Sequence, residues 1–419
     1  MYNINSKRLW ERLHEIGGIG ADPAGGISRF SWTPEYREAS LLLMKYMEDM
    51  GMTVRTDSVG NIFGRMDGED PTLPPILIGS HLDTVPQGGY FDGNAGVSAA
   101  LEVLSAIKEN NIRINRSVVL VAFCNEEASQ FLGGHFGSKA MAGRLPEDYL
   151  KTCTHKTTGQ VLYDAMNEYG MGLDPDHPEK SILSPSDYYC VIELHVEQGR
   201  TLLENNCSMS ILDGIAGIKQ FYITFHGEKA HAGGMALENR KDALQGAVRA
   251  AVKVDELAHG GGVATRGTVG YINVHPNEHN IIADEVTISV DFREIDETIW
   301  ENLYVELMDY VDTICKERNL TYEVRHTINT KPAVCDSRLV KLMKGIAEEL
   351  GYSTYDMISY PAHDVMQLVD LFPVAMIFLR SGNNGIAHHP DEFTSEEDMA
   401  EGTQVLLNAV VELANKNIL

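Results

Sequence analysis

The 419-residue chain is predicted to fold as an α/β protein, with a mostly parallel-sheet domain that carries a smaller inserted α+β domain. Three observations predict this. Apolar runs of strand length alternate with helical segments in the first half, the order of elements changes near Leu212, and the first pattern returns after Lys331. Such alternation is typical of a parallel sheet, and a chain of this length is expected to form two domains. We therefore expect a split domain of residues 1–212 and 329–419 around an inserted domain of residues 213–328.

The split domain is expected to begin with two helices. Ser6 is a candidate cap for the first, which would stop at Gly17. The second would begin at Thr33-Pro34, because proline is favoured at the first helical position, and end at Gly51. The strands of this domain are expected at 53–55, 61–64, 76–80, 117–123, 189–194 and 374–379. Its further helices are expected near 97–109, 137–142 and 337–350.

The inserted domain shows the order β-α-β-β-α-β. This order is compatible with a small sheet covered by two helices. Its strands are expected at 221–225, 268–274, 286–292 and 321–326, and its helices at 241–258 and 298–318.

The composition narrows the classes of partner and the compartment. A formal net charge of −26 argues against nucleic acid or an anionic membrane as partner, so an anionic substrate would need a local cationic group. The apolar runs are too short to span a bilayer, and the N-terminal residues contain no apolar signal core. The six cysteines form no CxxC pair, which is typical of reduced thiols. We expect a cytoplasmic protein.

Five residues of metal-ligand type stand at or near the ends of predicted strands. The carboxyl ends of strands in an open α/β sheet form its ligand crevice, so side chains distant in sequence can meet there. Each residue alone also fits a structural role, such as a hydrogen-bonded histidine, a turn aspartate or an exposed charge pair. Together, imidazoles and carboxylates at one sheet edge predict a metal site, and a site for two metals. The five residues are His81, Asp92, Glu127, His195 and His388.

Two neighbours of these residues are candidates for supporting roles. Asp83 lies two positions after His81 on a predicted strand, so its carboxylate is expected to accept the second imidazole N–H. Glu126 and Glu127 follow one strand directly and should point in different directions. One of the pair is then expected to bind metal, and the other to act on the substrate as acid or base.

Arg293 ends an alternating strand, and an arginine fork suits a carboxylate better than any other side chain. The alternative is an ion pair with Asp291 or Glu294. For the remaining histidines considered, a surface or hydrogen-bonded role is favoured over metal ligation: His135, His226, His275, His279, His363 and His389.

Six segments together resemble the M20 metallopeptidase superfamily. They are HLDTVPQGGYFDG, FCNEEASQF, ELHVEQG, HAG with NRKDAL, DFR, and GIAHHPDE. The resemblance is closer to the hydantoinase/carbamoylase branch, which contains N-carbamoyl-L-amino-acid hydrolases, β-ureidopropionases and allantoate amidohydrolases. It extends from Gly26 to Glu392.

The resemblance implies a role for each candidate residue. One metal would be held by His81 and His195 and the other by Glu127 and His388, with Asp92 bridging. Glu126 would be the general base, Asp83 would orient His81, and His231 would stabilise the oxyanion. Gln198 and Arg293 would contact the substrate. The inserted domain would form a homodimer in which His231 and Asn280 reach the partner subunit's active site.

The resemblance also implies the reaction. We expect hydrolysis of a linear amide or ureido C–N bond, most readily in an N-carbamoyl-L-amino acid, with two divalent ions drawn from Zn, Mn, Co or Ni. The substrate would be a small molecule with a carboxylate. Alternatives are an allantoate or β-ureidopropionate amidohydrolase, a dipeptidase or N-acyl-amino-acid amidase of the wider superfamily, and a non-catalytic binding protein on the same fold.

The chain departs from the family pattern where substrate would be recognised. The usual Ser-Gly-Ala-Gly-His-Asp loop is here residues 359–364, in which Pro361 has no N–H to donate and Tyr360 adds a large side chain. Ala128 and Gln130 replace a usual Gly and Arg, and residues 231–237 lack the usual Thr-Thr-Pro-Met. Tyr360 and Pro361 are therefore expected to shape the substrate pocket.

Overall fold

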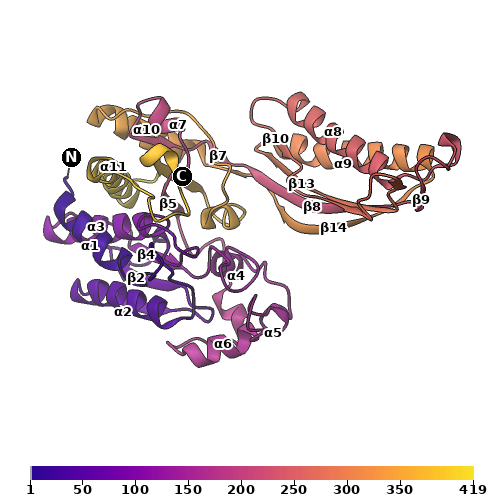
Figure 1. Ribbon diagram of the computed structural model, residues 1–419. Coiled ribbons are helices and arrows are strands. Elements are labelled where there is room, and N and C mark those ends of the chain that lie inside the picture. The colour runs from indigo at the N-terminus through magenta and orange to yellow at the C-terminus, as the bar shows by residue number, and fades with distance from the viewer. Residues whose placement is uncertain (1) are drawn as a thin grey trace. The chain divides into compact units, whose positions relative to one another are not determined.

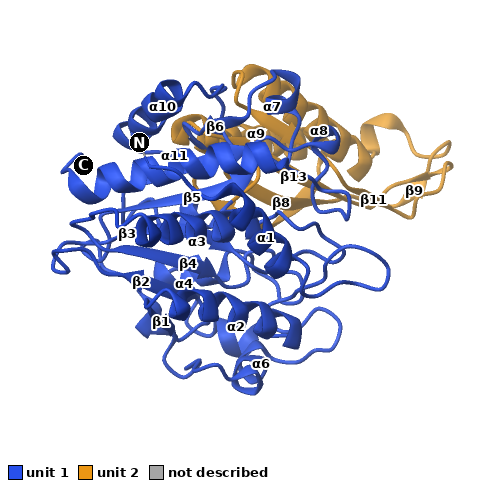
Figure 2. Cartoon of the chain, turned by 90° about the vertical axis from the view of Figure 1, so that its left-hand side faces the viewer, with its two compact units in different colours: residues 1–214, 334–359, 363–419 blue, residues 215–333, 360–362 orange. Residues whose placement is uncertain are grey.

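The computed structural model describes residues 2–419, which divide into two compact units (Figure 2). Unit 1 comprises the residues up to 214 together with 334–359 and 363–419, and unit 2 comprises 215–333 and 360–362. The inserted segment continues past residue 328 because its last strand runs to Thr330. The sequence did not predict that residues 360–362 group with unit 2. No helix within residues 2–419 has the length and apolar character needed to cross a membrane.

Unit 1 is built on a seven-stranded sheet, which confirms the predicted fold class (Figure 1). The four central strands β4, β3, β5 and β16 run parallel, while β1, β2 and β6 join antiparallel at the two sides. All residues of the four central strands are buried, as expected for a sheet covered on both faces. In sheet order the strands are β1 (Thr53–Thr56), β2 (Ile62–Met66), β4 (Val118–Phe123), β3 (Ile76–His81), β5 (Cys190–Val196), β16 (Val374–Leu379) and β6 (Met209–Ile211).

The helices of unit 1 begin at capping residues that are mostly readable in the sequence. Asn5, and not Ser6 as predicted, caps the first helix, because its side chain accepts the N–H of Arg8. Thr33 caps the second as predicted. A last helix capped by Ser395, which the sequence did not predict, packs against α3 and β16. The helices are α1 (Ser6–Gly17), α2 (Pro34–Asp49), α3 (Asn94–Glu109), α4 (Phe136–Met141), α5 (Tyr149–Thr152), α6 (Leu162–Tyr169), α7 (Thr201–Glu204), α10 (Ser337–Leu350) and α11 (Glu396–Asn415).

Unit 2 is an antiparallel sheet with two helices packed on one face (Figure 1). Strands β8 and β13 alternate buried and half-buried residues, which is the pattern of a sheet covered on one side. The strands are β10 (Arg266–Thr268), β11 (Ile272–His275), β13 (Glu285–Glu294), β8 (Gly217–His226) and β14 (Thr321–Thr330), with the short pair β9 (Ala230–His231) and β12 (Ile281–Ile282). The helices are α8 (Ala243–Gly260) and α9 (Glu297–Arg318). Strands β7 (Gly214–Ile215) and β15 (Ala333–Val334) lie where the chain passes between the units.

The single strand predicted at 268–274 is two strands. Thr268 pairs with Asp291, whereas Ile272 pairs with Ile288, so three residues of one strand face two of the other. This extra residue makes a bulge around Gly270 that ends β10 and starts β11.

Candidate metal centre

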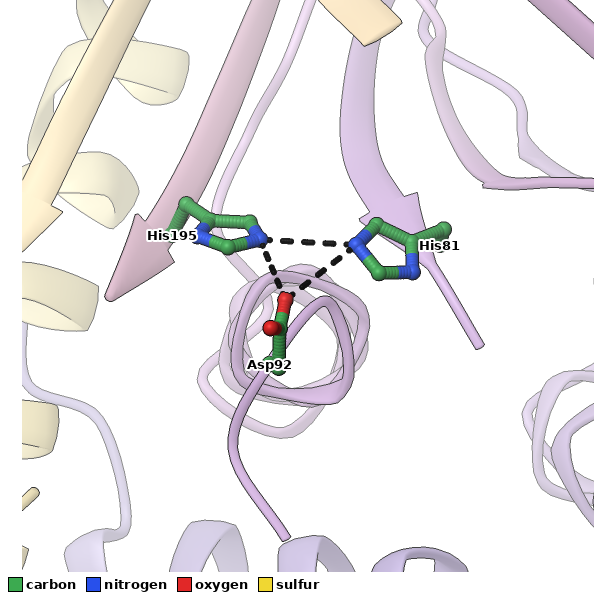
Figure 3. A group of neighbouring side chains, drawn as sticks. All are labelled: His81, Asp92 and His195. Carbon is green, nitrogen blue, oxygen red and sulfur yellow. Dashed lines mark hydrogen bonds and ion pairs between the residues drawn. The ribbon is translucent and has the colours of Figure 1, made fainter. Parts of the chain in front are cut away.

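Two histidines at the carboxyl edge of the unit 1 sheet converge on one carboxylate oxygen. His81 is the last residue of β3, and His195 lies near the end of the neighbouring strand β5. Their Nε2 atoms are 3.4 Å apart and lie 3.5 and 3.0 Å from Oδ1 of Asp92 (Figure 3). All three side chains are buried. This is the first group of ligand atoms that can hold a metal ion.

A second group forms around the other oxygen of the same aspartate. Nε2 of His388 lies 3.2 Å from Oδ2 of Asp92 and 3.5 Å from Oε1 of Glu127. The three ligand atoms of this group lie within 4.8 Å of one another. Asp92 is therefore shared, with one oxygen directed to each group, and the five residues chosen from the sequence do come together.

The loop that carries Asp92 is fixed by a close backbone approach and by a buried carboxylate. Gly93 has a φ of 65°, and a Cβ there would lie 2.4 Å from Nδ1 of His81, so only glycine fits this position. The Glu392 carboxylate accepts the N–H of Phe91 at 3.0 Å and that of Asp92 at 2.7 Å. The sequence had marked Glu392 only as the end of a family motif, with no role assigned.

The orientation of both histidine rings is set through their Nδ1 atoms. Nδ1 of His81 is 3.0 Å from the backbone oxygen of Asp83, and Nδ1 of His195 is 2.9 Å from that of Val196. A neutral ring that donates from Nδ1 to a carbonyl presents an unprotonated Nε2 to a metal, and without the metal Nε2 can carry a second hydrogen toward Asp92.

Asp83 contacts the His81 ring, although not through the atom predicted from the sequence. Oδ1 of its carboxylate is 3.8 Å from Nδ1 of His81. Oδ1 instead accepts the N–H of Glu126 at 3.1 Å, and Oδ2 accepts that of Glu127 at 3.0 Å. The reason is that β3 ends at His81, so the alternation of side chains assumed for residues two apart no longer holds at Asp83. The backbone oxygen takes the place of the carboxylate.

The charges of this cluster favour the binding of cations. Burial alone would oppose ionisation, but hydrogen bonds with His195, His388 and His81 hold the pKa of Asp92 well below its usual range. Burial raises the pKa of Glu127 well above its usual range, and the adjacent charges of Asp92 and Glu126 add to this effect. Oε1 of Glu127 is also buried without a hydrogen-bond partner. A divalent cation would satisfy this oxygen and replace the proton.

Glu126 stands beside the ligand groups as an ionised carboxylate. It is within 4.8 Å of ligand atoms of His81 and Glu127. Burial opposes its ionisation, but His135 lies 3.0 Å away and, with His81 and His363, lowers the pKa of Glu126 to about 2. A carboxylate in this state can accept a proton.

Gln198 lies against the second group. Its Nε2 donates to Oδ2 of Asp92 at 2.8 Å and is 3.2 Å from Nε2 of His388. The family resemblance assigned Gln198 to the substrate. Its amide lies next to His388, the ligand residue whose side chain is 49% accessible. The amide is therefore close to where a substrate can reach the cluster.

The other predicted substrate residues lie in unit 2. The guanidinium of Arg293 forms two 3.1 Å contacts with the carboxylate of Asp291, so the ion pair considered as an alternative is present. Nη1 of Arg293 donates to the backbone oxygen of Tyr360 at 2.7 Å, and the Tyr360 ring stacks on Arg266. Because a guanidinium has five N–H donors, Arg293 retains two for a further acceptor.

His231 ends β9 of unit 2, and Asn280 directly precedes the paired strand β12. The backbone N–H of Ala232 donates to the backbone oxygen of Asn280 at 2.9 Å. Nδ1 of His231 accepts the N–H groups of Gly233 and Gly234 at 3.1 and 3.0 Å. The neutral ring then carries its hydrogen on Nε2, and this exposed residue is available as a donor.

Comparison with known proteins gives consistent matches over nearly the whole chain. The model of the family described as Peptidase family M20/M25/M40 matches residues 77–412. N-carbamoyl-L-amino acid amidohydrolase of Geobacillus stearothermophilus is 36% identical over 411 residues, which are 98% of this chain and 99% of that protein. Allantoate amidohydrolase of Bacillus subtilis (strain 168) is 31% identical over 413 residues, 97% of each chain. The crystal structure of an amidase of the hydantoinase/carbamoylase family from Burkholderia multivorans superposes with a TM-score of 0.87 at 30% identity, covering 100% of both chains.

Proposed function

Because the chain belongs to the M20/M25/M40 peptidase family, we propose that it is a metal-dependent amidohydrolase that hydrolyses N-carbamoyl-L-amino acids. The observation that carries the proposal is the shared Asp92, whose two oxygens face two separate groups of imidazole and carboxylate ligands. The substrate class is supported by the relative named N-carbamoyl-L-amino acid amidohydrolase, which is 36% identical, against 31% for the relative named allantoate amidohydrolase.

The ligand groups fit two divalent ions. His81 and His195 would hold one, Glu127 and His388 the other, and Asp92 would bridge them. Nitrogen and carboxylate donors of this kind accept Zn, Mn, Co or Ni. When bound, such ions lower the pKa of a water molecule to near neutrality and polarise the carbonyl that it attacks.

The protein's own groups then move the proton and hold the substrate. Glu126 takes the proton of the attacking water and delivers it to the leaving nitrogen. The Nε2–H of His231 stabilises the oxyanion that forms at the carbonyl. The two remaining N–H donors of Arg293 bind the substrate carboxylate, Gln198 contacts the substrate beside Asp92, and Tyr360 and Pro361 shape the pocket.

We further propose that the protein is a cytoplasmic homodimer. Unit 2 would form the dimer contact, and His231 and Asn280 of one subunit would serve the active site of the other. The six cysteines are free thiols, which is the state that a reducing cytoplasm maintains.

The test is a substrate panel with the purified protein loaded with Mn, Co, Ni or Zn. The panel contains N-carbamoyl-L-amino acids and their D-enantiomers, β-ureidopropionate, allantoate, N-acyl amino acids and dipeptides. We expect the highest kcat/KM for an N-carbamoyl-L-amino acid. A higher value for allantoate would reassign the substrate, and binding of substrate without any turnover would favour a non-catalytic protein.

The role of Glu126 is tested by Glu126→Gln, which keeps the size of the side chain but cannot accept the proton. We expect kcat to fall by a factor of about 10²–10⁴ while metal content stays that of the wild type. The control is Glu168→Gln, an exposed glutamate of unit 1 that binds Gln160 and should not change kcat. Full activity of Glu126→Gln would contradict the proposed mechanism.

A further inference from the structure

A histidine outside the metal-ligand groups contacts Glu126 at two points. Nε2 of His135 lies 3.0 Å from Oε1 of the Glu126 carboxylate, and the backbone N–H of His135 donates to the Glu126 carbonyl oxygen at 2.8 Å. Both side chains are largely buried, with accessibilities of 16% and 11%. Within residues 2–419, this nitrogen has no hydrogen-bond partner, and its 3.0 Å ion-pair contact is with Glu126. The contact therefore joins these two residues specifically.

The backbone of His135 is held in the conformation that makes this contact. Its φ of 58° and ψ of 37° are in the left-handed region, which is uncommon for a residue with a side chain. On one side, Gly134 is packed so closely that a Cβ would lie 2.6 Å from the backbone carbonyl oxygen of Glu126. Nζ of Lys139 also donates to the carbonyl oxygen of Gly134 at 2.7 Å. The loop is thus fixed around Glu126 from several directions.

The charge next to Glu126 explains why such a contact is needed. Glu126 and Glu127 are adjacent carboxylates whose oxygens are within 4.8 Å of His81 and of each other. When Glu127 is ionised as a metal ligand, the two like charges repel, and a contact that fixes Glu126 opposes rotation of its side chain away from Glu127. A carboxylate has no hydrogen to donate, so the hydrogen between these two atoms belongs to Nε2 of His135. This contact holds Oε1 of Glu126. None of the described residues donates a hydrogen bond to Oε2.

We propose that His135 is a positioning residue for Glu126: it holds Oε1 so that Oε2 faces the attacking water and the leaving nitrogen. This inference rests on the function proposed above, in which Glu126 is the general base. Within residues 2–419, no hydrogen bond or ion pair joins His135 to the five ligand residues, so its loss should slow the proton transfer without changing metal binding.

The test compares His135→Gln with His135→Met. The two side chains have similar length and the same backbone cost at a positive φ, but only glutamine can donate a hydrogen bond to the Glu126 oxygen. In His135→Met we expect kcat to fall by a factor of about 10–100, with KM and metal content close to those of the wild type. In His135→Gln we expect kcat to recover at least half of that loss on a logarithmic scale.

The control is His177→Gln, because His177 also pairs with a carboxylate, that of Asp174 at 3.0 Å, but on the surface of unit 1. It should keep the wild-type kcat. Equal kcat values for His135→Gln and His135→Met would overturn the proposal, as would a loss of metal in either variant, which would give His135 a role at the ions. A wild-type protein that hydrolyses no member of the substrate panel would contradict the proposed function itself. An active wild-type protein whose two His135 variants have equal kcat would contradict only the role of His135, so the two failures are distinguishable.

Discussion

Glu392 fixes Asp92 from 300 residues further along the chain, because its carboxylate accepts the backbone N–H of Asp92 at 2.7 Å. The same oxygen, Oε1, accepts the N–H of Phe91 at 3.0 Å. Asp92 is the residue whose two oxygens face both ligand groups, so its backbone position determines the geometry of each.

The first prediction follows from this contact. Glu392→Gln keeps an oxygen that can accept both N–H groups, whereas Glu392→Met has similar size and no acceptor. We expect Glu392→Met to weaken metal binding by a factor of about 10–100, as removal of outer-shell partners usually does. Glu392→Gln should bind within a few-fold of the wild type. Competition with a chelator measures the metal affinity of each variant. Equal affinities of Glu392→Met and Glu392→Gln would contradict a positioning role for Glu392.

The second prediction concerns the close approach of Gly93 to His81. A residue other than glycine at a positive φ costs about 1–2 kcal/mol of unfolding free energy. In Gly93→Ala the new Cβ would also lie 2.4 Å from the His81 ring, so the ring must shift and metal binding should be lost.

Gly159→Ala is the matched control for Gly93→Ala. Gly159 has a φ of 73°, close to the 65° of Gly93, but a Cβ there would meet nothing within 4 Å. This variant should show the backbone cost alone and keep the metal content of the wild type. Denaturant unfolding and metal analysis of both variants separate the two effects, and normal metal binding by Gly93→Ala would contradict the prediction.

The third prediction is that metal stabilises the folded protein. Without cations, the burial that raises the pKa of Glu127 leaves an unsatisfied oxygen among several carboxylates. Ligand at about a thousand times its Kd adds about 4 kcal/mol of unfolding free energy, so saturating Mn or Zn should raise Tm by roughly 5–10 °C over the chelator-treated protein. Asp92→Asn should abolish most of this rise, whereas Asp176→Asn, at an exposed aspartate that binds Tyr163, should keep it. An unchanged Tm on chelation would argue against a metal site.

Much of the ligand set could be predicted from the sequence because strand ends are easy to locate. His81 and His195 end continuous apolar runs, and parallel strands bring such ends to one edge of the sheet. The family match likewise confirms the resemblance that the motifs suggested.

What the sequence could not predict depends on loops and on oxygens of the backbone. His135 and Glu392 reach the site from loops with no periodic pattern, and neither contact has a signal in the spacing of residues. Asp83 was chosen for its carboxylate, but the strand ends two residues earlier and its backbone oxygen makes the contact. The bulge at Gly270 required the pairing register, which a single strand pattern does not contain.

The last prediction tests whether His231 serves the partner subunit. Nδ1 of His231 accepts two backbone N–H groups, so the ring presents Nε2–H as a donor. His231→Asn keeps an acceptor near Nδ1 but removes that donor, and loss of an oxyanion donor should lower kcat by a factor of about 10²–10³.

The expected low activity of Glu126→Gln has a different cause, the loss of the general base. In a mixed dimer of the two variants, made by co-expression with two affinity tags, one active site would combine the intact Glu126 of one subunit with the intact His231 of the other. We expect the mixed dimer to recover about half of the wild-type activity, since a symmetric dimer has two sites and one is restored. Activity in the mixed dimer no higher than in the two pure variants would show that each His231 acts in its own subunit or not at all.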